Sequence, residues 1–182
     1  MTDDTAGHWI SRTVLADAAT ITVCTGASVA QVLDGFGAHH IPEPIDRILD
    51  SPHAVSWVRV RDLGGGIVLA CEDNDFQGST EPVLRHVSTG GRAASEYWNA
   101  GGMHCLSFAE HGTVLSATLD YAWTPILTNS AAVNSAIAGL DFLTAGTGAA
   151  LTAIGRFTGH HLQPEQMHAL LDTDQAHRMT PA

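Results

Sequence analysis

The clearest pattern in the chain is the alternation of apolar and polar positions near its middle. Three alternating runs lie between Arg92 and Asp120, and the steps Gly101-Gly102 and His111-Gly112 separate them. Alternation with a period of two indicates strands that turn one face to a core, and short glycine-containing steps indicate hairpins. Residues 92–120 are therefore predicted to form a three-stranded antiparallel meander.

Other segments predict further strands and several helices. Residues 20–25 alternate and are rich in β-branched side chains, and residues 58–61 and 67–71 flank three consecutive glycines, as in a hairpin. Ser28 and Gln31 fit a helix capping box, and proline in the first turn predicts helices near residues 80 and 164. Apolar residues at helical spacing predict helices around residues 133–140 and 151–154.

These elements predict the fold class. Strands joined by hairpins and interspersed with short helices indicate a single α+β domain with a predominantly antiparallel sheet and helices packed on one face. The 182 residues are long enough for one full core, and no linker divides them. We expect one domain over residues 1–182, with frayed ends at about 1–7 and 173–182.

The meander predicts one polar face. If both turns are two-residue hairpins, Trp98 lies opposite Cys105, and Glu96 lies opposite Ser107. The third strand then adds Thr118 and Ser116 to the same face. The opposite face would carry the apolar residues Tyr97, Leu106, Phe108, Leu115, Ala117 and Leu119.

Charge and composition exclude several classes of partner. With 8 Lys+Arg against 19 Asp+Glu, the net charge is -11, so phosphate backbones and anionic lipids would be repelled. No apolar run is long enough for a membrane helix, and the first eight residues lack the pattern of a signal peptide. We therefore expect a cytoplasmic protein with no nucleic-acid or membrane partner. A basic protein is a possible partner.

The cysteines and most of the histidines give no metal motif. Cys24, Cys71 and Cys105 are an odd number without CxxC spacing, so buried thiols are expected. The eleven histidines are the one compositional sign of chemistry, because histidine changes charge near neutral pH. Neither His160, His161 and His168 nor the acidic run Glu72, Asp73 and Asp75 has the spacing of a known metal site, and the acidic run is expected to be a solvated turn.

Glu96 is the leading candidate for a catalytic group. A glutamate in mid-strand must be solvated, paired, or held in a pocket with a raised pKa, since burying an unpaired charge is costly. In the last case Glu96 would be a general base and Trp98 a wall of the pocket. Cys105, Ser107, Ser116 and Thr118 would then bind the substrate. The alternative is a polar sheet face that meets solvent, which is ordinary for an antiparallel sheet.

His39 and His40 are the second pair of candidates. They lie next to Glu43 on a proline-containing loop, and loops on a rigid scaffold often carry reactive groups. One of them would be the general acid if this loop folds over the sheet. Otherwise they are exposed histidines without a role. His104 is expected on the apolar side of the meander, as a core histidine.

Several runs resemble a family of small actinobacterial proteins of unknown function. They include Glu-Asp-Asn-Asp-Phe-Gln-Gly-Ser from Glu72 and the later run Tyr97-Trp98-Asn99; together the similar segments cover residues 22–37, 72–99, 108–112 and 158–159. The resemblance supports the fold and supplies no catalytic residues. Glu96 and His104 depart from the family pattern, which has an apolar residue and a non-histidine in their places.

Together these observations predict a small cofactor-independent enzyme of actinobacterial specialised metabolism. It would transfer a proton in an isomerisation, cyclisation or elimination of a small organic metabolite, without a bound metal. Two alternatives remain open. One is a non-enzymatic acidic interaction module, resembling an immunity or adaptor protein, and the other is a carrier of a small ligand. A pocket around Glu96 would favour the enzyme or the carrier.

Overall fold

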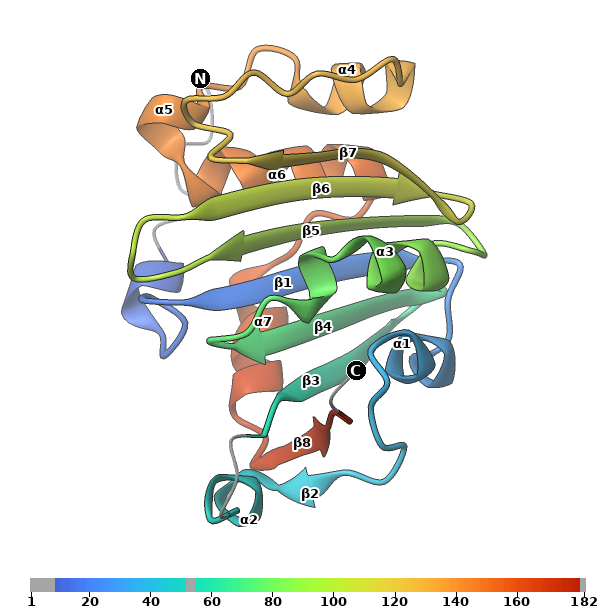
Figure 1. Ribbon diagram of the computed structural model, residues 1–182, viewed down its shortest axis with the longest axis vertical. Coiled ribbons are helices and arrows are strands. Elements are labelled where there is room, and N and C mark those ends of the chain that lie inside the picture. Colours follow the sequence, from blue (N-terminus) through green and yellow to red (C-terminus); the bar gives the residue numbers. More distant parts are fainter. Residues whose placement is uncertain (1–8, 52–54, 181–182) are drawn as a thin grey trace.

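An eight-stranded antiparallel sheet forms the centre of the computed structural model, which describes residues 9–51 and 55–180 (Figure 1). The strand order is β2-β8-β3-β4-β1-β5-β6-β7. Helices accompany the sheet, so the chain is a single α+β domain, as predicted. The strands are β1 (Ala19–Thr25), β2 (Glu43–Pro44), β3 (Trp57–Gly64), β4 (Ile67–Asp73), β5 (Arg92–Trp98), β6 (His104–Glu110), β7 (Thr113–Leu119) and β8 (Gln175–Arg178).

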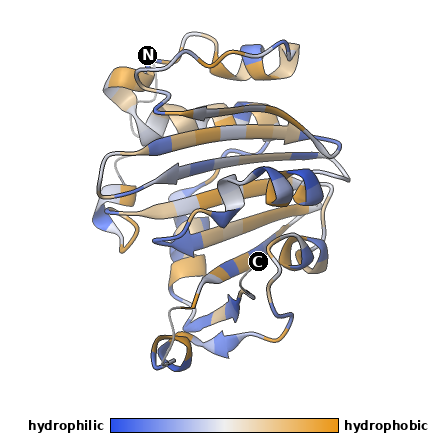
Figure 2. Cartoon of the chain, viewed as in Figure 1, coloured by the Kyte–Doolittle hydropathy of each residue, from blue (hydrophilic) through white to orange (hydrophobic). Residues whose placement is uncertain are grey.

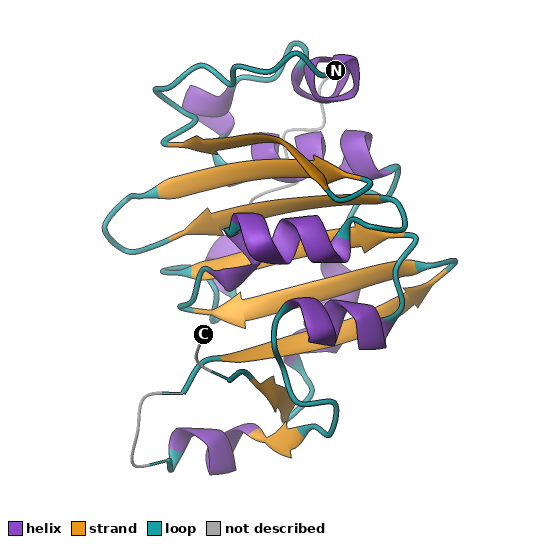
Figure 3. Cartoon of the chain, turned by 45° about the vertical axis from the view of Figure 1, so that its right-hand side comes forward, coloured by secondary structure: helices purple, strands orange, loops and turns teal. Residues whose placement is uncertain are grey.

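The helices cover both faces of this sheet. Helices α1 (Val29–Gly35) and α3 (Glu81–Val87) pack on one face, and α6 (Thr147–Thr158) and α7 (Pro164–Leu171) pack on the other (Figure 1 and Figure 3). Helix α4 (Ala131–Ile137) packs against α6 beside the β7 edge of the sheet. Short helices α2 (Ile45–Leu49) and α5 (Phe142–Ala145) and the 3-10 turns η1 (Ile10–Arg12) and η2 (Gln77–Ser79) complete the fold. The expectation of helices on one face is wrong.

The central strand explains why both faces are covered. On β1, Ile21 and Val23 join the core under α6, whereas Cys24 joins the core under α1 and α3. Thr22 also points to the second face, where its hydroxyl donates to Ser95 Oγ at 3.2 Å. Hydrophobic colour accordingly runs along β1, β4 and β6 (Figure 2). A small polar residue on a strand can lie under a second layer of helices or on a solvent-facing surface, and the alternation of apolar and polar residues is the same in both cases.

Most predicted elements are confirmed. The capping box of Ser28 and Gln31 begins α1, the hairpin at three glycines joins β3 to β4, and proline lies in the first turns of α3 and α7. The predicted fraying of residues 173–182 is wrong for β8, which pairs with β2 and β3. The other expected frayed end, residues 1–7, lies outside the described residues.

The predicted register of the meander is wrong at its first turn by one residue. Trp98 pairs with His104, and residues 99–103 form a five-residue connection in which the Asn99 N–H donates to the Met103 carbonyl at 3.1 Å. The second turn is the predicted two-residue His111-Gly112 step. A bulge between Phe108 and Ala109 then shifts the rest of the β6–β7 pairing.

These two shifts change which residues share a face, because neighbouring residues of a strand point to opposite sides. Glu96 lies opposite Leu106, which lies opposite Thr118. Trp98 and His104 therefore share the α6 face with Glu96. Cys105 and Ser107 lie on the α3 face instead, where Cys105 Sγ is 3.5 Å from Ser107 Oγ.

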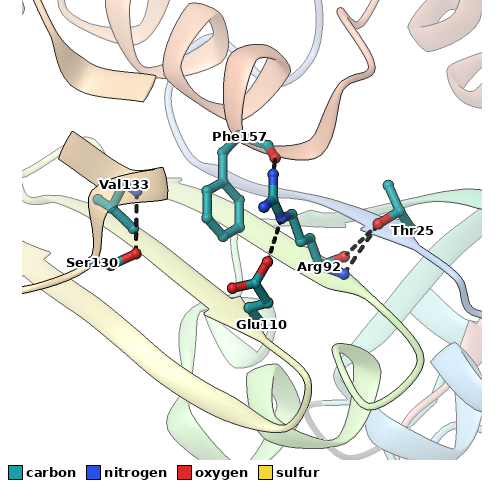
Figure 4. Close-up of polar contacts among 6 residues, drawn as sticks. All are labelled: Thr25, Arg92, Glu110, Ser130, Val133 and Phe157. Carbon is teal, nitrogen blue, oxygen red and sulfur yellow. Dashed lines mark hydrogen bonds and ion pairs between the residues drawn. The ribbon is translucent and has the colours of Figure 1, made fainter. Parts of the chain in front are cut away.

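Arg92 fastens the C-terminal end of α6 to the sheet (Figure 4). Its guanidinium donates to the Phe157 carbonyl at 2.8 Å and to Glu110 Oε1 at 2.6 Å, and it lies 5.0 Å from the centre of the Phe157 ring. Its backbone N–H donates to Thr25 Oγ1 at 3.1 Å. A cation at the carbonyl end of a helix also complements the helix dipole.

Glu72 is not in a solvated turn. It is 1% exposed, and its carboxylate accepts hydrogen bonds from the N–H groups of Gln77 at 2.9 Å and Gly78 at 2.7 Å. Desolvation by burial raises the pKa of Glu72 to about 8, against the effect of these two bonds. The same acidic run contains Asp73, which pairs with Arg59 at 3.0 Å. These carboxylates hold loops and strands together.

Candidate functional site

Glu96 is fully enclosed near the C-terminal end of β5. The side chain is 0% exposed, and its strand neighbours are Ile21 of β1 and Leu106 of β6. The alternative of a polar face in contact with water is therefore wrong for this residue. A buried carboxyl group needs partners, because loss of hydration is costly.

Two side chains approach the carboxyl group. The Tyr121 hydroxyl donates a hydrogen bond to Glu96 Oε1 and lies 3.5 Å from His104 Nδ1. His104 Nδ1 is itself 3.8 Å from Glu96 Oε1. The rings of His104 and Tyr121 meet edge to face, with their centres 5.6 Å apart. Glu96, Tyr121 and His104 therefore form one cluster.

Burial and neighbouring side chains shift the pKa values of this cluster. Burial raises the pKa of Glu96 above its ordinary value, whereas His104 and Tyr121 oppose this shift by favouring the ionised form. Burial and the Glu96 carboxylate together raise the pKa of Tyr121, so the phenol keeps its proton. Glu96 Oε2 is enclosed and has no hydrogen-bond partner among the described residues. Such an atom costs about 1–3 kcal/mol unless something satisfies it.

The N-terminal end of α6 borders the same cluster. Thr147, the first residue of α6, lies close enough to Glu96 and Tyr121 for its hydroxyl to favour the ionised forms of both. Since Arg92 holds the other end of α6, the helix spans the sheet between two polar anchors. Figure 1 shows α6 starting at the edge where β5 ends and β6 begins.

A pocket of about 370 Å³ opens beside the cluster. His104, whose side chain is 31% exposed, connects the buried carboxyl group to this pocket. Trp98 forms a wall, and its indole N–H donates to the Leu15 carbonyl at 2.9 Å. The described lining residues are Ile10, Ser11, Ala16, Asp17, Trp98, Asn99, Ala100, Gly102, His104 and Thr147.

This arrangement has the parts required for acid-base chemistry. An imidazole at the pocket can exchange a proton with a bound molecule. The enclosed carboxyl group behind it can hold a proton or balance an imidazolium charge, and Tyr121 orients both. Perturbed titratable groups beside a cleft are characteristic of functional sites.

The structure does not bring His39 or His40 to this cluster. The His39 backbone N–H bonds to Arg178 of β8, which is four strands away from β5, or roughly 19 Å at ~4.8 Å per strand. The His40 ring bonds to Asp34 at 2.8 Å and is about half exposed. The condition for a general acid on this loop, that it folds over Glu96, is not met.

The predicted substrate-binding residues divide between the two faces. Trp98, Ser116 and Thr118 lie on the face of Glu96, and Trp98 lines the pocket. Ser116 and Thr118 are buried and bond to each other at 3.2 Å. Cys105 and Ser107 lie on the opposite face, so contact with a ligand in this pocket is excluded for them.

Three members of the site were not identified in the sequence. His104 was assigned to the apolar side of the meander, and the register shows that this is also the side of Glu96. A five-residue connection between Trp98 and His104 would have revealed the pair. Tyr121 follows β7, and Thr147 is the first residue of α6. No local sequence pattern marks either residue as a neighbour of Glu96.

Within residues 9–51 and 55–180, no group of three or more His, Cys, Asp or Glu side chains is arranged to hold a metal ion. No helix in these residues has both the length and the apolar character that crossing a bilayer requires. Comparisons with protein-family models, curated proteins and solved structures found no match. The site therefore has to be interpreted from its own geometry.

Proposed function

We propose that this protein is a cofactor-independent enzyme that binds a small organic molecule in the pocket beside His104 and transfers a proton on it. The observation that supports this function is the cluster of Glu96, Tyr121 and His104, enclosed on one side and open to the pocket on the other. Isomerisation, cyclisation and elimination are the reaction types that need only such groups.

The geometry assigns different roles to the two ionisable groups. His104 reaches the pocket and is the catalytic residue: its Nδ1 faces Tyr121 and Glu96, which leaves the other ring nitrogen for the ligand. Glu96 has no exposed surface, so it is a positioning residue that acts through His104. This reverses the expected assignment, in which Glu96 was the base and a loop histidine the acid.

A chromogenic probe tests for a positioned base in the pocket. 5-Nitrobenzisoxazole opens when a base removes its C–H proton and the N–O bond breaks, which releases a coloured phenolate. The wild-type protein should open it about a hundredfold faster than the His104→Gln variant, which is the lower end of the range for general base catalysis. The Glu96→Gln variant should shift the pH at which the rate is half-maximal, which a purely structural role would not do.

The matched control is His40→Gln, because His40 is an exposed histidine paired with a carboxylate outside the pocket. Its rate should equal that of the wild type. Equal rates for wild type and His104→Gln would refute the proposed function. Binding of the probe without ring opening would instead leave the small-ligand carrier.

One surface favours the interaction module as a second candidate. On the α3 face, Cys105 lies opposite Tyr97 of β5 and Leu119 of β7. The ring of Phe76 packs edge to face on that of Tyr97, with the ring centres 6.1 Å apart. Phe76 is 50% exposed and Leu119 is 57% exposed. Exposed apolar groups on an acidic protein suit a basic partner with an apolar centre. Leu119→Asp should leave ring opening unchanged, because it lies on the face away from the pocket.

A further inference from the structure

A second pocket, of about 330 Å³, lies between the C-terminal end of α7, the start of α2 and the segment that leads into β8. We call it the α7 pocket. Its charged lining residues are Asp46 of α2, Asp172 and Asp174 after α7, and Arg59 of β3. It is separate from the pocket of His104, because β3 is three strands away from β5, or roughly 14 Å at ~4.8 Å per strand. A volume of this size is at the lower end for small-molecule sites.

Arg59 is a buried cation that has hydrogen-bond donors to spare. It is 7% exposed, and its guanidinium carbon lies 4.7 Å from the centre of the Trp57 ring. Its two hydrogen bonds to Asp73, at 3.0 and 3.1 Å, both leave from Nη1. Nε is enclosed and has no partner among the described residues. Trp57 and Asp73 therefore hold the guanidinium in place without using the edge that contains Nε.

This unused edge indicates an acceptor in the pocket. The Nε and Nη2 groups of a guanidinium form a planar fork that matches the two oxygens of a carboxylate. Arg59 is itself a lining residue of the α7 pocket, so a bound molecule contacts its side chain directly. A carboxylate on this side of Arg59 would supply the partner that Nε lacks within the described part of the chain.

The three aspartates of the α7 pocket carry charges that the described chain does not pair. Asp46, Asp172 and Asp174 are exposed, and none of them forms an ion pair within residues 9–51 and 55–180. Asp172 is the C-cap residue of α7, where a carboxylate lies beside the negative end of the helix dipole. A cation bound beside Asp172 would remove this unfavourable interaction.

The two kinds of charge favour a ligand that carries both. An anion without a positive group would be repelled by three aspartates, and a cation without a negative group would be repelled by Arg59 and would leave Nε without an acceptor. A molecule with one carboxylate and one ammonium group avoids both penalties.

We infer that the α7 pocket binds a small free amino acid, with its carboxylate on Arg59 and its ammonium group towards the aspartates. The uncharged lining residues suit a short side chain or a short methylene chain, since three of the four are apolar: Pro44, Ile45, Leu171 and Thr173. The inference does not depend on the proposed function, because no described residue lines both pockets.

Titration with matched small molecules tests this ligand class. Alanine carries the two charges close together, and 4-aminobutanoate carries them three methylenes apart, whereas ethylamine and propionate each lack one charged group. The backbone amide signals of the protein are followed by NMR. At least one amino acid should shift the amides of Ile45, Thr173 and Asp174, with a Kd about tenfold or more below those of ethylamine and propionate.

Two variants assign the charges. Arg59→Lys keeps the positive charge and removes the fork, so the amino acid should bind about tenfold more weakly. Asp172→Asn keeps the size of the side chain and removes its charge, and binding should weaken a few-fold. The matched control is Asp50→Asn, because Asp50 is an exposed carboxylate at the C-terminal end of α2 and does not line the pocket. Its affinity should equal that of the wild type.

Several results would overturn the inference. One is the absence of shifts with both amino acids at about 10 mM, well above a Kd of about 1 mM. Another is equal affinity for an amino acid and for ethylamine or propionate, since one charge would then suffice. A third is unchanged affinity in Asp172→Asn and in a folded Arg59→Lys. If Arg59→Lys does not fold, Asp172→Asn and the comparison of the four molecules decide the question. None of these measurements uses ring opening of 5-nitrobenzisoxazole, so failure here leaves the proposed function as it was.

Discussion

Glu96 shows how a single residue determines the chemistry of this site. A glutamate between two apolar strand neighbours should be costly, yet it lies at 0% exposure with Tyr121 on one oxygen and His104 nearby. The fold tolerates this residue because Tyr121 and His104 favour its charged form while burial favours its neutral form. A carboxyl group held between these influences is suited to change its protonation when His104 does.

The titration of Glu96 is the direct test of this coupling. Carboxyl-detected NMR should give a pKa above the ordinary 4.5, because burial is the largest cause of the shift. In the His104→Gln variant the pKa of Glu96 should rise further, since the strongest of the influences that favour the carboxylate is gone. His40→Gln should leave the titration unchanged. A lower pKa in His104→Gln would contradict the coupling.

The raised pKa of Glu96 also makes the free energy of unfolding depend on pH. Because the pKa of Glu96 is higher in the folded than in the unfolded chain, its contribution to stability is complete below about pH 4.5 and is lost as pH rises through the folded value. Glu96→Gln cannot ionise, so its free energy of unfolding should fall less than that of wild type over this range. Urea unfolding at a series of pH values measures the difference.

At the scale of elements, α6 is the part that the site depends on. Its first turn faces the pocket, and its last turn is held by Arg92 through the Phe157 carbonyl and Glu110. Small residues on its inner side, Ala150 and Ala153, let it lie close to the sheet. The position of Thr147 at the pocket is therefore set partly at the far end of the helix.

Replacement of Arg92 tests this anchoring. Arg92→Met keeps the apolar stem and removes the charge, and it leaves Glu110 and the helix carbonyl without their partner. The free energy of unfolding should fall by about 1–3 kcal/mol, as for a lost hydrogen bond to a charged group. Arg85→Met is the control: Arg85 pairs with Glu81 on an exposed helix surface, where the effect should be within about 0.5 kcal/mol.

The sequence predicted elements better than their pairing. The capping box at Ser28, the glycine hairpin and the strands of the meander follow from local patterns, because each depends on residues within one turn or one hairpin. The register was wrong because the connection after Trp98 has five residues and because a bulge follows Phe108. The length of this connection and the position of the bulge both depend on the pairing between strands. As a result, Cys105 and Ser107 lie on the face opposite Glu96 and not on the predicted shared face.

At the scale of the whole molecule, charge is the dominant feature. The chain has 19 acidic residues against 8 basic ones, and several arginines bond within the fold, as Arg61 does to the Ala169 carbonyl. The surface therefore repels itself at neutral pH. This repulsion acts on stability and on the choice of partner, and not on the fold.

Salt should consequently stabilise the protein at neutral pH. Raising NaCl from low ionic strength to about 0.2 M shortens the Debye length to less than ~10 Å and weakens the repulsion between surface carboxylates. The melting temperature should rise by a few degrees at pH 7. At about pH 5, where the net charge is smaller, the rise should be much reduced. No change at pH 7 would mean that the carboxylates lie too far apart to interact.

The sequence by itself determined the α+β class, the antiparallel meander, most helices and the acidic character. Periodicity, caps and turns are properties of short segments, and the acidic character is a property of the overall composition, so each can be obtained without knowledge of the fold. It also marked Glu96 as out of place in a strand.

The tertiary structure alone decided what surrounds Glu96. His104, Tyr121 and Thr147 reach it through strand register, a return of the chain after β7, and the packing of α6. It also decided that helices cover both faces and that β8 completes the sheet. Contacts between distant segments depend on register and on the close packing of side chains, and a one-residue shift transfers a side chain to the other face of the sheet.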